Sequence, residues 1–247
     1  MTDTASPRVE VHGSPEELAT TVAGAFVSLL ANCQTAGEIP RVGLTGGTIA
    51  DAIHREIARL APESEVDWSR VDFFWGDERF VSPDSPDRNA GQARSAFLDA
   101  VGADPARIHE IPSTADADSV DAAATAYADA IRSVGTGKFH LLMLGVGPDG
   151  HIASLFPGYP QLDVDDRIAV PVTDSPKPPP ERVSLTFPAL NRADEVWFVV
   201  SGTDKAEAVG RALAATTPDV HEIPAAGVRG VGATIWFLDR EAASQVP

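Results

Sequence analysis

The chain has 247 residues, 43% of them hydrophobic, and is long enough to bury a substantial core without disulfides. Its 36 acidic and 19 basic side chains give a formal net charge of −17, which disfavours nucleic acid and anionic membranes as partners. The single cysteine, Cys33, excludes an internal disulfide and a cysteine-based zinc site, and is expected to be a packed or half-buried thiol. The first ten residues lack signal-peptide features, and no run approaches a membrane span. We therefore expect a cytoplasmic protein.

Apolar, β-rich runs alternate with alanine-rich stretches along the whole chain. No repeat or long linker interrupts them, so we predict a single domain over residues 1–247. In chain order, the predicted elements are strand 8–12, helix 15–32, strand 41–45, helix 49–60, strand 71–75, helix 89–100, a short segment at 107–111, helix 119–134, strand 139–144, strands 168–172, 182–186 and 195–201, helix 204–215 and strand 233–238.

Two of the predicted strands, at 139–144 and 196–200, are almost continuously apolar, as expected when helices cover both faces of a sheet. The pattern predicts an α/β fold with a mostly parallel central sheet flanked by helices. In such folds, ligands bind beyond the carboxyl ends of the strands. Function should therefore be sought in the loops that follow Leu44, Trp75, Leu144 and Val200.

The first of these loops contains Gly46, Gly47 and Thr48 at the start of a predicted helix. Paired glycines let backbone N–H groups turn toward an anion, and the helix N-terminus favours negative charge, as a phosphate monoester requires. The loop matches neither a Walker A motif nor a dinucleotide-binding fingerprint. A plain tight turn between strand and helix is the alternative.

The second loop places Arg79 just beyond a strand, where its guanidinium could grip a phosphate through two hydrogen bonds. Asp77 or Glu78 would hold that guanidinium in place, and Arg88 and Asn89 could reach the same pocket. For Glu78, we favour the alternative of an exposed charge on a turn, because exposed charges are usually solvated.

The third loop, residues 145–158, gives the strongest signal, because glycines, a proline and an Asp149-Gly150-His151 sequence follow a buried strand directly. The reference pKa of histidine suits a general base at neutral pH, and Asp149 could orient the ring or help to bind substrate. A hydrogen-bonded structural histidine is the alternative reading of His151. The remaining histidines are predicted to be structural or exposed: His12, His54, His109, His140 and His221.

The fourth loop leads into a helix whose first turn contains Lys205. A cation is poorly placed at a helix N-terminus, so it suggests an anionic ligand, although an ordinary exposed lysine is the alternative. No zinc-type or EF-hand spacing occurs, so no metal site is predicted. A serine nucleophile is also disfavoured, because Gly-x-Ser-x-Gly is absent.

Together these motifs resemble the 6-phosphogluconolactonase family in order and spacing, as do residues 179–186, Asn191 and 224–236, so that the resemblance spans about 9–241. It implies a modified Rossmann-like, three-layer α/β domain shared with glucosamine-6-phosphate isomerases/deaminases. It also implies hydrolysis of 6-phospho-D-glucono-1,5-lactone, the second step of the oxidative pentose phosphate pathway, without a cofactor. The expected partner is this small phosphorylated lactone, bound by a monomer or small homo-oligomer.

The resemblance also implies roles for individual residues. His151 would activate water against the C1 carbonyl, and backbone N–H groups of residues 147–150 are candidate oxyanion donors. The 6-phosphate would be held by the first loop and nearby cations, namely Gly46, Gly47, Thr48, Arg79 and Lys205, with Arg182 as a possible addition. One departure affects the first loop, because the family commonly has serine after the glycines where this chain has Thr48.

Two other functions compete with lactone hydrolysis. Sugar-phosphate isomerases or deaminases share the Gly-x-Asp-Gly-His loop but carry an Asn-Glu pair shortly afterwards, whereas residues 154–158 here contain no carboxylate. A non-catalytic sugar-phosphate sensor would keep the phosphate grip and lose the base. The presence of Asp149 and His151 disfavours that reading.

Overall fold

The structure is a computed structural model that describes residues 6–135, 137–214 and 219–247. Its central sheet has the strand order β1-β9-β8-β5-β2-β3, and every neighbouring pair is parallel. This confirms the predicted parallel, Rossmann-like sheet. The six strands are β1 (Arg8–His12), β2 (Arg41–Leu44), β3 (Asp72–Trp75), β5 (Leu141–Leu144), β8 (Glu195–Val200) and β9 (Ala233–Asp239).

A second, smaller sheet is antiparallel, in the order β4 (Asp77–Arg79), β7 (Arg182–Leu185) and β6 (Ala169–Val172). The sequence predicted β6 and β7 as strands but assigned β4 to a loop. That assignment is wrong. Three consecutive charged residues give no strand signal by themselves, and β4 forms because it pairs with β7, which lies about a hundred residues further along the chain. The register places Arg79 opposite Arg182.

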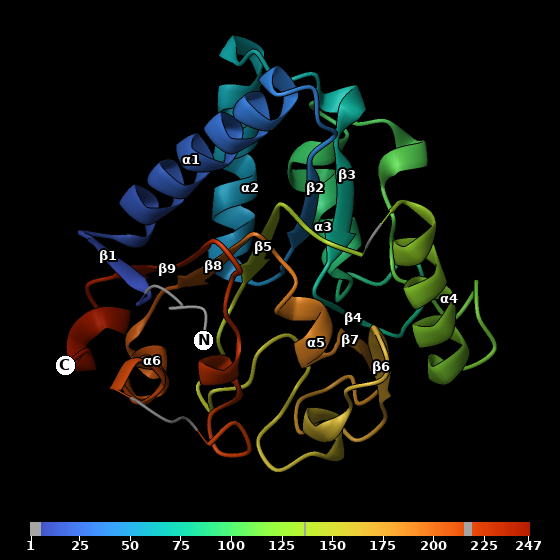
Figure 1. Ribbon diagram of the computed structural model, residues 1–247, viewed down its shortest axis with the longest axis vertical. Coiled ribbons are helices and arrows are strands. Elements are labelled where there is room, and N and C mark those ends of the chain that lie inside the picture. Colours follow the sequence, from blue (N-terminus) through green and yellow to red (C-terminus); the bar gives the residue numbers. More distant parts are fainter. Residues whose placement is uncertain (1–5, 136, 215–218) are drawn as a thin grey trace.

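Helices surround the central sheet, with α1 and α2 on one side of β1, β9, β8 and β5 and α6 on the other (Figure 1). Two predicted helices change form. The segment 89–100 continues as a π-helix after α3, and 204–215 opens with a 3-10 turn; its last residue lies outside the described part of the chain. The α-helices are α1 (Pro15–Thr35), α2 (Thr48–Leu60), α3 (Asn89–Ala93), α4 (Val120–Ser133), the unpredicted α5 (Phe187–Leu190) and α6 (Ala206–Ala214).

Helix α1 is long and apolar enough, by length and composition alone, to cross a membrane. The expectation that no segment reaches this level is therefore wrong by that measure. In the structure, however, its side chains Leu18, Val22, Phe26 and Leu30 are fully buried at helical spacing. Its apolar character is thus explained by packing in the protein core. Cys33, near its end, is half-buried as predicted.

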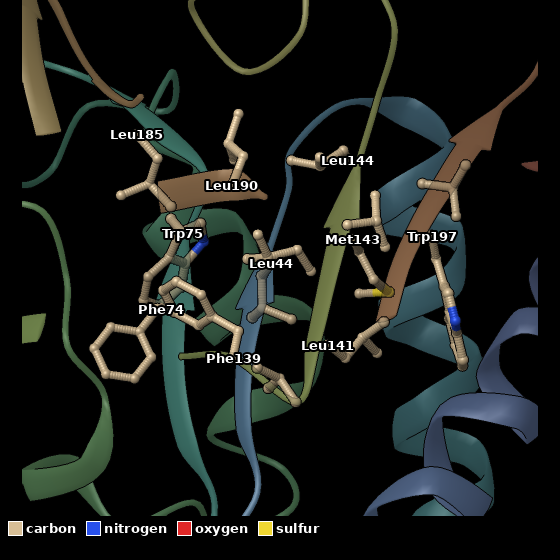
Figure 2. Close-up of a cluster of buried hydrophobic side chains, with 14 of the residues drawn as sticks. Leu44, Phe74, Trp75, Phe139, Leu141, Met143, Leu144, Leu185, Leu190 and Trp197 are labelled. Atoms are coloured by element: carbon tan, nitrogen blue, oxygen red, sulfur yellow. The ribbon is translucent and has the colours of Figure 1, made fainter. Parts of the chain in front are cut away.

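The hydrophobic core is continuous between the two sheets. In Figure 2 the buried cluster combines Leu44, Trp75 and Leu144 of the parallel sheet with Leu185 of β7 and Leu190 of α5. All four residues of β5 are buried, which agrees with its continuously apolar sequence. Because the small sheet packs against the carboxyl end of the large one, its polar strand β4 is held beside the loops that leave β2 and β5.

The sheet reverses its direction of growth between β2 and β5. From β2 the chain moves outward to β3, and it then returns to the other side of β2 to build β5, β8 and β9 in turn. Loops at such a switch point diverge and leave a crevice at the carboxyl ends of the strands. The Gly46 and Gly145 loops are the two that diverge here.

The buried histidine of α2, His54, should make stability depend on pH. Burial lowers its pKa to about 4, against a small opposing effect of Asp51, and its ring packs against Phe97. Below pH 6.5 the unfolded chain binds this proton and the folded chain does not, so stability falls as pH drops from 6.5 to 4. The expected loss is about 3 kcal/mol, at about 1.4 kcal/mol per pKa unit.

Urea unfolding of the wild type and of His54→Leu between pH 7 and pH 4.5 measures this contribution. The leucine variant has no titrating group at this position, so its free energy of unfolding should fall less steeply with pH. Equal slopes for the two proteins would show that His54 does not remain neutral in the folded state.

Candidate active site

A cavity of about 870 Å³ opens at the switch point, where the four predicted loops meet. Among the described residues, its walls contain four cations in a protein with a net charge of −17, namely Arg79, Lys177, Arg182 and Lys205. Most predicted site residues line it: Gly46, Gly47, Thr48, Asp77, Arg79, Asn89, His151, Arg182 and Lys205. Asp149, the predicted partner of His151, is not among the residues that line the cavity, and its carboxylate contacts Nδ1 of the histidine ring.

His151 is held by its own loop. Its Nδ1 lies 2.5 Å from Oδ1 of Asp149, and its ring packs on Phe156 with 4.6 Å between centroids. Burial raises the pKa of Asp149, but hydrogen bonding and charge from His151 outweigh burial, and the pKa is lowered to about 2. The carboxylate is therefore ionised at neutral pH and accepts the proton at Nδ1. A neutral ring would then carry its lone pair on Nε2, and His151 is one of the residues that line the cavity.

The loop brings its backbone very close to this ring. A methyl group added to Gly147 would lie 2.0 Å from Nδ1 and Cε1 of His151 and 2.5 Å from Oδ1 of Asp149. Only glycine leaves room for the ring in this position. The Gly147 N–H donates to the carbonyl of His151, which closes the loop.

These internal bonds change one sequence-based expectation, that N–H groups of residues 147–150 face the substrate as oxyanion donors. The N–H groups of Gly147 and Gly150 bond to carbonyls within the loop, and Pro148 has no N–H. The Asp149 N–H donates none of the hydrogen bonds found among the described residues. The expectation is therefore wrong for Gly147, Pro148 and Gly150, and the Asp149 N–H stays a candidate donor.

The first glycine loop presents free donors. Helix α2 begins at Thr48, and Gly47 precedes it with φ +99°, a conformation that favours glycine. The N–H groups of Gly46, Gly47 and Thr48 donate none of the hydrogen bonds found among the described residues. They stand at a helix N-terminus on the cavity wall, which is a favourable place for an anion.

Arg79 lines the same cavity as the first glycine loop. Its Nη1 donates to the carbonyl of Asp87 at 3.0 Å and to Oδ1 of Asn89, while its buried Nε has no partner among the described residues. Asn89 in turn donates to the carbonyl of Asp77 and lies so close to Gly46 that a methyl group there would be 1.9 Å from Oδ1. The arginine is therefore positioned by an amide, with donors left for an anion.

Glu78 is not the exposed turn residue that was expected, since it is only 1% exposed. Its carboxylate accepts the backbone N–H groups of Arg79, Asn89 and Ala90 at 2.8–2.9 Å. Burial raises its pKa, although these hydrogen bonds and Arg88 act in the opposite direction. Glu78 thus joins β4 to the start of α3 and fixes Arg79 and Asn89 relative to each other.

Three further residues considered from the sequence use their charged groups in hydrogen bonds within the protein. Asp77 accepts the hydroxyl of Ser154 at 2.6 Å, so it binds the loop after His151 and does not hold Arg79. Arg88 is 2% exposed and donates to the carbonyl of Ile111, away from the cavity. Arg182 lines the cavity, but it donates to three carbonyls of the preceding proline-rich segment: Lys177, Pro178 and Pro179.

Lys205 lines the cavity from the 3-10 turn before α6 and pairs with Asp204. The turn itself is anchored, because Ser201 and the N–H of Gly202 donate to the carboxylate of Asp239 at the end of β9. Sequence reasoning did not find Lys177, which lines the cavity together with Pro178. The available signal was its place just before Pro178–Pro180 in a stretch of rigid backbone.

One group among the described residues brings three metal-ligand atoms within 4.8 Å of one another: Cys33, Glu38 and His140. It lies at the amino end of β5, away from the cavity. Nδ1 of His140 accepts the Arg41 N–H at 3.0 Å, so the ring proton belongs on Nε2, which contacts Glu38 at 2.9 Å. A nitrogen that carries a proton cannot bind a metal, so this group does not fit one.

The fold and cavity define a Rossmann-like α/β protein with a cationic pocket at its switch point. The family described as glucosamine-6-phosphate isomerases/6-phosphogluconolactonase matches residues 13–236, and the chain belongs to this family, as predicted. It is 40% identical to a 6-phosphogluconolactonase of Streptomyces coelicolor, over 100% of this chain and 97% of that protein. It is 43% identical to a 6-phosphogluconolactonase of Mycobacterium tuberculosis, over 83% of this chain and 84% of that protein.

Solved structures agree with the fold. The crystal structure of a 6-phosphogluconolactonase from Thermotoga maritima superposes with a TM-score of 0.82 at 26% identity, covering 95% of this chain and 100% of that one. The names of these relatives agree with the predicted enzyme class, a carboxylic ester hydrolase. The family description includes isomerases as well, so the choice between the two chemistries depends on the site residues.

Proposed function

We propose that this protein hydrolyses 6-phospho-D-glucono-1,5-lactone to 6-phosphogluconate, with His151 as the general base. The observation that carries the proposal is the His151–Asp149 pair, because His151 lines a cavity rich in cations and its Nδ1 contacts the carboxylate. A δ-lactone is an activated ester, so positioning, one base and an oxyanion donor suffice without a covalent nucleophile.

In this mechanism His151 takes a proton from water at Nε2 while the water oxygen bonds to C1. The carbonyl electrons move to its oxygen and give a tetrahedral oxyanion. On collapse the bond from C1 to the ring oxygen breaks, and the ring oxygen receives the proton held by His151. The carboxylic acid then loses its proton to solvent. Asp149 stabilises the transient imidazolium, as its low pKa allows.

The 6-phosphate is assigned to the corner formed by the first glycine loop, Arg79 and Lys205. The unused N–H groups of Gly46 to Thr48 and the position of the Arg79 guanidinium on the cavity wall support this assignment. Charge-assisted hydrogen bonds from these donors suit a phosphate monoester. The pocket would hold the substrate by this end and present C1 to His151.

Isomerisation or deamination is the rival chemistry within the family. It would require a further proton carrier close to His151. The segment after the histidine instead supplies Ser154, which is buried and bonded to Asp77, and Phe156, which packs on the ring. Lactone hydrolysis needs no such carrier, so it is the better fit.

The experiment that tests the proposal follows loss of the lactone carbonyl signal of 6-phosphogluconolactone, with and without EDTA, against spontaneous hydrolysis. We expect acceleration that EDTA does not reduce. No acceleration would contradict the proposal and would favour isomerase or deaminase activity, assayed with glucosamine 6-phosphate.

The close approach of Gly147 to His151 gives a second test. Gly147→Ala must displace the ring or the loop, and a misplacement of about 1 Å can cost about 100-fold in rate. We expect kcat/KM for the lactone to fall by about that factor. Gly24→Ala, in helix α1 with open space around the added methyl, is the matched control and should keep full activity. A fully active Gly147→Ala enzyme would show that the ring position is not critical.

A further inference from the structure

We propose that Lys177 is a further catalytic residue, whose ammonium group binds the oxyanion formed at C1 and the carboxylate of the product. The inference rests on the proposed lactonase function and deepens it. It starts from the shortage of oxyanion donors in the His151 loop: Gly147 and Gly150 donate within the loop and Pro148 has no N–H, which leaves only the N–H of Asp149 among these four residues. A cation beside C1 would supply the electrostatic stabilisation that a single N–H does not.

Lys177 is the lysine whose ammonium group has no partner among the described residues. The chain has three lysines, and two of them form ion pairs, Lys138 with Asp194 and Lys205 with Asp204. No hydrogen bond or ion pair from the ammonium group of Lys177 occurs within residues 6–135, 137–214 and 219–247, although the residue lines the cavity. A positioned but unpaired cation suits a ligand that carries negative charge.

The backbone around Lys177 is held rigidly. Its carbonyl accepts Nη2 of Arg182 at 3.0 Å and the hydroxyl of Ser175 at 2.9 Å, while its N–H donates to the same hydroxyl. The N–H of Ser175 donates to the carbonyl of Pro180, and the three prolines 178–180 restrict the backbone further. Arg182 is itself 4% exposed. The buried arginine therefore acts as a positioning residue that fixes the lysine on the cavity wall.

The charge of Lys177 acts on both sides of the cavity. Burial raises the pKa of Asp149, and Lys177 is one of the charges that lower it, after His151. The pKa of Asp204 is lowered mainly by its hydrogen bond from Lys205, and also by Lys177. Lys177 is thus within electrostatic reach of the base and of the proposed phosphate corner. A sugar acid extended between these two ends would place C1 close to it.

In the reaction, Lys177 would keep its protons throughout. Its positive charge would stabilise the carbonyl oxygen as it becomes negative during water attack, and it would then pair with the C1 carboxylate of the product. The lysine therefore distinguishes ligands by their C1 group, whereas Arg79 and Lys205 would recognise the phosphate.

The test uses Lys177→Gln, with Lys138→Gln as the matched control, because Lys138 is an exposed lysine outside the cavity. Loss of one oxyanion donor lowers kcat by about 100- to 1,000-fold. We expect this loss in Lys177→Gln and partial recovery in Lys177→Arg, with similar thermal unfolding for all variants. A kcat within threefold of wild type, in an enzyme that does accelerate lactone hydrolysis, would overturn the inference and leave the proposed function standing.

Binding measured by calorimetry supplies a readout independent of turnover. 6-Phosphogluconate carries a C1 carboxylate and glucitol 6-phosphate does not. Lys177→Gln should raise the Kd of 6-phosphogluconate about tenfold, the effect of one charge-assisted hydrogen bond. The Kd of glucitol 6-phosphate should not change. An equal rise in Kd for both ligands would show that Lys177 binds the phosphate, which contradicts the inference. An unchanged Kd for both ligands would show that Lys177 binds neither group, which also contradicts it. Failure of the wild type to hydrolyse the lactone would instead contradict the proposed function.

Discussion

Replacement of His151 by alanine is expected to lower kcat for 6-phosphogluconolactone by about 10²- to 10⁴-fold, the usual contribution of a positioned general base. The physical reason is that no other histidine is found among the described residues of the cavity wall, and the ring of His151 is held by the Asp149 carboxylate. Binding of 6-phosphogluconate should remain, because the phosphate corner is unchanged. Stopped-flow detection of acid release, corrected for spontaneous hydrolysis, gives the rates, and calorimetry gives the affinity.

The control for this prediction is His221→Ala. His221 is 48% exposed, pairs with Asp163 and does not line the cavity. It should retain wild-type kcat. If His151→Ala also retained wild-type kcat, the assignment of the base would be wrong, although the chain could still be a lactonase. Loss of both turnover and product binding would indicate a structural role for the ring.

Replacement of Arg79 by alanine should act on binding of the phosphorylated substrate. A hydrogen bond to a charged group contributes about 1.5–3 kcal/mol, so kcat/KM for the phosphorylated lactone should fall by about 10- to 150-fold, mainly through KM. Hydrolysis of unphosphorylated glucono-1,5-lactone should be nearly unaffected, because this substrate has no phosphate group that could contact Arg79. Initial rates on the two lactones, measured side by side, check this difference.

Arg55→Ala is the matched control for Arg79→Ala. Arg55 lies on α2 outside the cavity, pairs with Asp51 at 2.9 Å and is 72% exposed. Its removal changes the net charge by the same amount and should leave both substrates unaffected. Similar losses on both lactones in Arg79→Ala would refute the phosphate role and point to disruption of the Asn89 contact instead.

The sequence predicted the central architecture correctly because its signals are local. Continuous apolar runs such as β5 and β8 indicate strands buried on both faces, and their alternation with helices indicates a parallel sheet. Glycine-rich loops after those strands indicated where a cavity lies. For this reason the sequence predicts a common site for the Gly46 loop, Arg79, His151 and Lys205, and these residues do line one cavity.

Tertiary structure alone decided how polar residues near the site are used. Glu78 was expected on the surface, yet it is buried because α3 folds back and offers it backbone N–H groups from Asn89 and Ala90. The strand β4 exists only because it pairs with β7, more than a hundred positions away. Charged residues carry little local information on burial, since their partners are chosen by the fold.

The same distinction applies within the candidate site. The composition and spacing of the Gly145–Gly158 loop determined that His151 would be presented next to Asp149. They did not determine whether the N–H groups of that loop would be free, because this depends on hydrogen bonds that form only when the turn closes. Nor did they identify Lys177, whose carbonyl accepts a hydrogen bond from Arg182, the first residue of β7. Local sequence thus determined most of the elements and the proximity of His151 to Asp149, whereas the hydrogen bonds of the folded loops decided which donors keep no partner within the described protein.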